Sequence, residues 1–163
     1  VVVRILLKRY LDMETIDFSV NELGKPYHKE IAGKQTVNFN ISHSGEFILE
    51  GFAVGMDIGV DVQEMAGCPD YREIAGNFYT AEEAEDVINE GPELFFQYWA
   101  AKEAYVKAIG IGLGRGMDFF SVRNGEITEK GRKGQGWHLY PVKIEGYAAY
   151  VAAHKKGDKS NEL

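Results

Sequence analysis

The sequence predicts an α+β protein built from two similar lobes, of which the first is incomplete. Helical and strand-like patterns alternate along its 163 residues. The stretches Ile16–Gly24 and Met117–Gly125 resemble one another, and each follows a helical pattern and precedes two strand-like runs. This shared order favours an internal duplication over a chance match. We therefore expect a first lobe over residues 1–55, a second over 56–155 and a polar tail over 156–163.

Local patterns predict the individual elements. Apolar residues recur at helical spacing in Val3–Leu11 and Pro92–Ile109. The run Thr80-Ala81-Glu82-Glu83 has the form of a capping box and opens a further helix that ends at Gly91. Runs rich in apolar and aromatic residues predict strands at Thr36–Ile41, Phe47–Val54, Asp57–Gln63, Trp137–Ile144 and Tyr147–Ala153. The second copy has a strand and a helix before its long helix, so we expect roughly 45 residues to be missing before Val1.

Composition and charge exclude some classes of protein. Residues 51–98 carry 11 acidic side chains and 1 basic side chain, within a net charge of −7. A nucleic-acid-binding protein would need a basic stripe, so we expect no nucleic-acid partner. No apolar run approaches the roughly 20 residues that cross a bilayer, so we expect no membrane partner. A single cysteine, Cys68, excludes an internal disulfide and favours a cytoplasmic protein.

A candidate metal site begins on the strand Ile58–Gln63. Because strand side chains alternate, Gly59, Asp61 and Gln63 share one face. Carboxylate and amide oxygens are ligands for a hard cation such as Mg²⁺. On this pattern alone, a solvated aspartate is the simpler interpretation.

The helix Pro92–Ile109 carries a second candidate group. Trp99, Glu103 and Lys107 recur every four residues and form one stripe, beside a separate apolar stripe. An ordinary surface ion pair between Glu103 and Lys107 would contribute only about 0.3–0.5 kcal/mol. The tryptophan at the head of the stripe and the glycine-rich loop after the helix favour a cleft instead.

The third candidate is a polar turn formed by Ser42, His43 and Ser44, which follows a strand and could donate hydrogen bonds to phosphate oxygens. An ordinary hairpin turn is the alternative. His43 has no acidic residue in a pattern that would orient it as a base, so we interpret it as a phosphate donor.

Five motifs follow one another along the chain: Gly24-Lys25-Pro26, Phe39-Asn40-Ile41-Ser42-His43-Ser44, Gly59-Val60-Asp61-Val62, Phe78-Tyr79-Thr80-Ala81-Glu82-Glu83 and Trp99-Ala100-Ala101-Lys102-Glu103-Ala104-Tyr105-Val106-Lys107. In this order they resemble the motifs of the surfactin-type 4′-phosphopantetheinyl transferases. The resemblance extends from Val1 to His154 and implies the transferase fold of two similar α+β lobes with the active site between them. It implies a holo-[acyl-carrier-protein] synthase activity: Mg²⁺-dependent transfer of 4′-phosphopantetheine from coenzyme A to a serine of an acyl or peptidyl carrier protein. A member of this family can act as a monomer, which we expect here.

The resemblance also implies a role for each site residue. Asp61 and Glu103 match metal-binding carboxylates, and Glu83 matches a third acid near the metal. Glu103 is the candidate base and Lys107 the candidate lysine on the pyrophosphate. Lys25, Ser42 and His43 match groups that hold the nucleotide end of coenzyme A. The docking surface for an acidic carrier would use basic residues, for which Lys102, Arg115 and Arg123 are candidates.

Two departures from the family pattern leave alternatives open. Gln63 stands where many relatives have a second acid, so it or a water would complete the metal site. Basic residues that grip the 3′-phosphate in relatives precede the matched region. A non-catalytic module that binds coenzyme A or a carrier, and a Mg²⁺-dependent phosphohydrolase, are the alternative interpretations.

Overall fold

The computed structural model describes residues 5, 8, 9, 18–20, 26–28, 37–112, 116–134 and 136–155. Its helices are α2 Tyr71–Phe78, α3 Ala81–Glu90 and α4 Pro92–Ile109, and a 3₁₀ turn covers Arg123–Gly125. Its strands are β1 Phe18–Val20, β2 Pro26–His28, β3 Val37–Ser44, β4 Phe47–Val54, β5 Met56–Glu64, β6 Phe120–Ser121, β7 Thr128–Glu129, β8 Arg132–Lys133, β9 Trp137–Pro141 and β10 Tyr147–Lys155. The predicted α+β class is confirmed.

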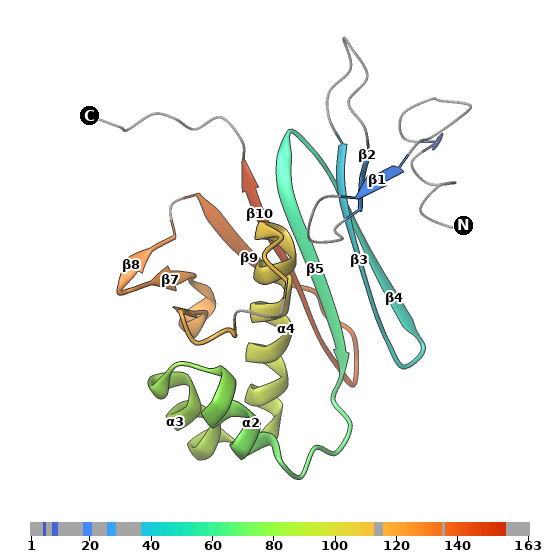
Figure 1. Cartoon of the computed structure of the whole chain (residues 1–163). Coiled ribbons are helices and arrows are strands. Elements are labelled where there is room, and N and C mark those ends of the chain that lie inside the picture. Colours follow the sequence, from blue (N-terminus) through green and yellow to red (C-terminus); the bar gives the residue numbers. More distant parts are fainter. Residues whose placement is uncertain are drawn as a thin grey trace.

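The sheet β5-β10-β9 and helix α4 form the centre of the fold (Figure 1). Strand β10 pairs antiparallel with β5 on one side and with β9 on the other. Helix α4 lies across one face of this sheet, while α2 and α3 pack near its amino-terminal end (Figure 1). The helix therefore connects the sheet to the smaller helices.

Gly59 sets how closely β5 approaches α4. A Cβ atom at this position would collide with the carbonyl oxygen of Ala104 and the amide nitrogen of Ala108. Only a glycine allows the two backbones to come this near. Asp61 is two residues further along β5 and points to the same face of the strand. Its side chain therefore lies next to this contact. The glycine thus determines which turn of α4 faces Asp61.

The β3–β4 hairpin packs on the other side of β5 (Figure 1). Its strands pair in register from Val37↔Val54 to Ser44↔Phe47, and they form a sheet separate from β5-β10-β9. Gly51 of β4 faces the side chains of Ile58 and Val60, and an added Cβ would lie 2.6 Å from Val60 Cγ1. Strand β5 is consequently enclosed on both faces.

Helix α4 is buried on more sides than a single apolar stripe predicts. Every residue from Ala100 to Val106 is buried. One side contacts β5 and β10, and the other packs against Met117, Phe120 and Val122 of the following segment. The predicted two-stripe helix is therefore wrong in detail, because the chain after the helix folds back to cover its second side.

Most predicted elements are present, with some differences. The hairpin turn lies at Gly45 and Glu46, where Gly45 has φ +52°, so the prediction of a Ser42–Ser44 turn is wrong. Those residues extend β3, because left-handed backbone at Gly45 supplies the reversal. The capping box at Thr80 is confirmed, with Thr80 Oγ1 accepting from the Glu83 amide. Helix α2 and the β7–β8 hairpin were not predicted. The predicted helix Val3–Leu11 lies mostly outside the described residues, and the division into two lobes stays a prediction.

Replacement of Gly59 by alanine should separate β5 from α4. We expect the free energy of unfolding to fall by about 2–4 kcal/mol, because the methyl group meets rigid backbone atoms. Urea unfolding followed by circular dichroism measures this loss. The control is Gly67→Ala, because Gly67 is exposed and an added Cβ there meets nothing within 4 Å. Equal stability of the two variants would contradict the role given to Gly59.

Candidate active site

Asp61 lies at the centre of a polar cluster between β3, β5 and α4. Only 5% of the residue is exposed. Its Oδ1 accepts a hydrogen bond from Ser42 Oγ at 2.7 Å and forms an ion pair with Lys107 Nζ at 2.6 Å. Lys107 Nζ also lies 3.2 Å from Ser42 Oγ. Three elements therefore supply one connected group of polar side chains.

Glu103 joins this group from the preceding turn of α4. Glu103 and Lys107 are four residues apart and so lie on one side of the helix. The residue is 5% exposed, and its carboxylate interacts electrostatically with both Asp61 and Lys107. The predicted association of Asp61, Glu103 and Lys107 is present in the structure.

The two carboxyl groups have shifted proton affinities. Burial raises the pKa of Asp61, and the Lys107 ammonium offsets part of that rise. Burial and then the negative charge of Asp61 raise the pKa of Glu103 to about 7, with Lys107 opposing the rise. Two buried acids share one lysine, so their negative charges exceed its positive charge when both acids are ionised.

This donor set fits a divalent cation. Mg²⁺ binds to one or two carboxylates and fills its remaining positions with water or substrate phosphate. Asp61 and Glu103 supply two such oxygens, and Lys107 balances one of their two charges when both are ionised. In the described part of the chain, no three His, Cys, Asp or Glu side chains gather as a metal group. Any further ligands would come from another residue type, from water or from the substrate.

The other predicted site residues lie at different distances from this cluster. Gln63 is half-buried on the same face of β5 as Asp61. Ser42 contacts Asp61 and Lys107 directly. His43 is exposed, and as the next residue of β3 it points to the opposite face from Ser42. Lys25 lies outside the described residues. The structure therefore groups Ser42 with the acids and separates it from His43.

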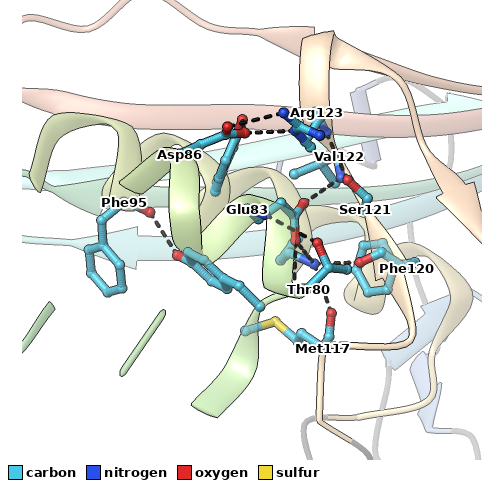
Figure 2. Close-up of polar contacts among 12 residues, drawn as sticks. Thr80, Glu83, Asp86, Phe95, Met117, Phe120, Ser121, Val122 and Arg123 are labelled. Carbon is cyan, nitrogen blue, oxygen red and sulfur yellow. Dashed lines mark hydrogen bonds and ion pairs between the residues drawn. The ribbon is translucent and has the colours of Figure 1, made fainter. Parts of the chain in front are cut away.

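Glu83 belongs to a second polar cluster, in which it lies beside Thr80 and Val122 (Figure 2). It is fully buried and forms a 2.7 Å ion pair with Lys102, which is fully buried too. Its oxygens also accept from the backbone amides of Val122 at 2.7 Å and Thr80 at 3.1 Å. Lys102 Nζ donates to the carbonyls of Met117 and Phe120 at 2.8 and 2.6 Å. This cluster ties α3, α4 and the segment 117–122 together.

Such a cluster has the properties of a structural anchor. Every charged group in it is paired and hydrogen-bonded, which burial of a charge requires. Burial lowers the pKa of Lys102, and the Glu83 carboxylate opposes that change. The structure shows no contact between the Glu83 carboxylate and Asp61 or Glu103 among the described residues. The catalytic role of Glu83 stays a prediction.

The candidate carrier-docking residues differ in their exposure to solvent. Lys102 is wrong as a docking residue, because its side chain is fully buried and its ammonium group is used inside the protein. The side chain of Arg123 is 44% exposed and forms an ion pair with Asp86 at 2.7 Å (Figure 2). Arg115 lies outside the described residues. None of the helices that the structure describes is long and apolar enough to cross a membrane.

A polar pattern on β3 was missed by the sequence interpretation. Asn38, Asn40, Ser42 and Ser44 all form hydrogen bonds to the backbone of β5. The signal was present as polar residues at every second position of β3. The sequence interpretation placed Asn38 and Asn40 in a strand and Ser42 and Ser44 in a turn, and it did not pair them with β5, which lies about 20 residues further along the chain.

Comparisons with known proteins define the class. Residues 57–153 match the model of the 4′-phosphopantetheinyl transferase superfamily, which covers more than half of the chain. The chain belongs to this superfamily. The matched region contains Asp61, Glu83, Glu103 and Lys107.

Two relatives that are named as 4′-phosphopantetheinyl transferases agree with this assignment. The 4′-phosphopantetheinyl transferase Sfp of Bacillus subtilis (strain 168) is 35% identical over 129 residues, which cover 76% of this chain and 55% of the relative. The 4′-phosphopantetheinyl transferase psf-1 of Bacillus pumilus is 33% identical over 120 residues, covering 71% of this chain and 49% of the relative. The chain thus spans about half the length of the curated relatives it matches. A crystal structure of Thermotoga maritima holo-[acyl-carrier-protein] synthase aligns with TM-score 0.46 and 19% identity, covering 62% of this chain and 64% of that one.

From the raised pKa of Glu103 we predict how the stability of the metal-free protein depends on pH. The pKa of this carboxyl rises from 4.5 in the unfolded chain to about 7 in the fold. The ionised group therefore lowers the free energy of unfolding little below pH 4.5 and most above pH 7. In EDTA, Glu103→Gln should therefore raise the melting temperature by roughly 5 °C at pH 8, with a smaller change at pH 5. Thermal unfolding at both pH values measures the change in melting temperature. Glu85→Gln, at an exposed position, is the control. A Glu103→Gln effect of equal size at both pH values would contradict the assignment.

Proposed function

We propose that this chain transfers the 4′-phosphopantetheine group from coenzyme A to a serine hydroxyl of an acyl or peptidyl carrier protein. The observation that carries the proposal is the grouping of Asp61, Glu103 and Lys107 within the region that matches the transferase superfamily. The relatives carry the name of this activity. An anionic donor and two acids in one place require cationic groups, which Lys107 supplies in part.

Glu103 is the proposed general base. The serine oxygen attacks the phosphorus nearer to pantetheine, and the bond from that phosphorus to the bridging oxygen breaks. The serine proton passes to the Glu103 carboxylate, and 3′,5′-ADP leaves with the bonding electron pair. In the metal-free protein the pKa of Glu103 is about 7, so its carboxylate is available as a base near neutral pH.

Asp61, Glu103 and Gln63 are the proposed ligands of Mg²⁺, with water or phosphate oxygens completing the set. When bound, the ion would neutralise charge on the pyrophosphate and keep the acids ionised. Asp61 already forms hydrogen bonds that fix its carboxylate. The protein's own contribution is therefore to hold two acidic oxygens in place before the substrate arrives.

Lys107 is the proposed donor to the pyrophosphate and its leaving group. Its side chain is 29% exposed, so its ammonium group can reach both Asp61 and the outside of the cluster. Lys25, Ser42 and His43 are proposed to hold the nucleotide end of coenzyme A, and Glu83 to support catalysis. The exposed position of His43 is compatible with a contact to a bound nucleotide. We also expect a cytoplasmic monomer whose macromolecular partner is the carrier protein.

A direct assay tests the reaction. Purified protein is mixed with coenzyme A, Mg²⁺ and an apo carrier protein, and the mass of the carrier is measured. We expect a phosphopantetheine adduct with the wild type, and a transfer rate lower by about 10²–10³-fold with Glu103→Gln, because the base is lost. Glu93→Gln on the exposed start of the same helix should keep the wild-type rate.

The outcomes separate the alternatives. Release of nucleotide without a carrier would indicate a phosphohydrolase instead. Binding of coenzyme A with no mass gain on any carrier would indicate a non-catalytic module. Full activity of Glu103→Gln, with an unchanged circular dichroism spectrum for each variant, would remove Glu103 from the mechanism.

Asp61 should determine the metal requirement. We expect Asp61→Asn to raise the Mg²⁺ concentration for half-maximal transfer about 10-fold or more, because an amide oxygen brings no negative charge to the ion. A Mg²⁺ titration of the transfer rate measures the change. Glu64→Gln, at the exposed end of the same strand, is the matched control and should leave the titration curve in place. An unmoved curve for Asp61→Asn would refute the ligand assignment.

A further inference from the structure

Strand β3 contacts β5 through side chains that reach the β5 backbone. The amide of Val60 donates to Asn40 Oδ1 at 2.8 Å, and the amide of Val62 donates to Ser42 Oγ at 3.3 Å. At the ends of the contact, Asn38 Nδ2 donates to the Met56 carbonyl at 2.6 Å, and the Glu64 amide donates to Ser44 Oγ at 2.9 Å. We call these four contacts the side-chain seam.

The seam takes the place of a backbone ladder. Strands β3 and β5 belong to separate sheets, while the opposite edge of β5 pairs with β10 along its whole length. Both strands of the seam run in the same direction, since Asn40, Ser42 and Ser44 meet residues 60, 62 and 64 in turn. On the edge of β5 away from β10, the amides of Val60, Val62 and Glu64 thus donate to side chains of β3.

The two middle contacts lie on either side of Asp61. Asn40 is 8% exposed, and Val60 is fully buried, so water does not replace this bond easily. Ser42 holds the following amide and also donates to the Asp61 carboxylate. Together Asn40 and Ser42 hold the backbone before and after the residue that carries the acid.

We propose that Asn40 is a positioning residue for Asp61, acting through the backbone of β5 and without contact to substrate. The part of its test that measures kcat rests on the proposed transferase function. Asn40 accepts one hydrogen bond from Val60, and this contact determines the path of the strand immediately before the carboxylate. Asn38 also bonds to the β5 backbone, but it donates through Nδ2 to the carbonyl of Met56, five residues before Asp61, and so lacks this effect.

The test compares Asn40→Ala with the matched control Asn38→Ala. Serine already accepts a β5 amide at positions 42 and 44, so Asn40→Ser is the conservative rescue. We expect kcat to fall about 10–100-fold in Asn40→Ala, because small misplacements of a reacting group are costly. KM for coenzyme A should stay within about 2-fold, because Asn40 does not touch it. Asn40→Ser should recover most of kcat, and Asn38→Ala should stay near the wild type.

Two further readouts do not depend on turnover. Binding of Mn²⁺, followed by electron paramagnetic resonance, should weaken about 5–10-fold in Asn40→Ala only, because the ligand Asp61 is less well held. Hydrogen exchange of the peptide containing Val60 and Val62 should become faster in the same variant, and slower again in Asn40→Ser. If Asn40→Ala does not fold, Asn40→Cys replaces it, because a thiol fills more volume yet accepts hydrogen bonds poorly.

Each result decides the question. Equal kcat and Mn²⁺ affinity in Asn40→Ala and Asn38→Ala would overturn the proposal, as would failure of Asn40→Ser to restore them. Lack of Mn²⁺ binding by the wild type would overturn it too. If the wild type binds Mn²⁺ but transfers nothing to a carrier, the proposed function fails while the Mn²⁺ comparison still decides on Asn40.

Discussion

The close contact between strand β5 and helix α4 is the constraint on which the site depends. Gly59 has no side chain, so its backbone lies directly against the backbone at Ala104 and Ala108. Once this pair of elements is fixed, alternation along the strand brings Asp61 toward the helix, and the helical repeat brings Glu103 and Lys107 to meet it. Residues 42 positions apart thereby form one electrostatic unit.

Two neighbouring charged residues of α4 belong to two different polar clusters. Lys102 and Glu103 differ by one position, about 100° around the helix, and so face different surroundings. Lys102 meets Glu83 and two carbonyl groups and has every donor engaged in a buried network. Glu103 instead shares one lysine with a second acid, and its pKa rises to about 7. The fully paired cluster links α3, α4 and the segment 117–122, whereas Asp61 and Glu103 share one lysine and remain able to bind a cation or a proton.

The sequence predicts clearly which faces of two elements carry Asp61 and Glu103, and it predicts some of the surrounding elements less clearly. Periods of two in Ile58–Gln63 and four in Trp99–Lys107 correctly gave the faces that carry Asp61 and Glu103, because these are local properties of one element. The resemblance supplied the pairing of the two elements, which no local period contains. Helix α2 was missed because its eight residues are too few for a clear period. The role of Asn40 was missed because a side-chain bond to a distant backbone has no sequence signature of its own.

The side-chain seam also explains how a hydroxyl comes to lie beside Asp61. In a regular ladder, backbones are about 4.8 Å apart and side chains stand away from the space between strands. Where side chains replace the ladder, as between β3 and β5, a polar side chain occupies that space. Ser42 can then accept from the Val62 amide and donate to Asp61 with the same oxygen. The contact that joins the hairpin to the central sheet is therefore also the contact that orients the acid, and packing and chemistry are linked through one serine hydroxyl.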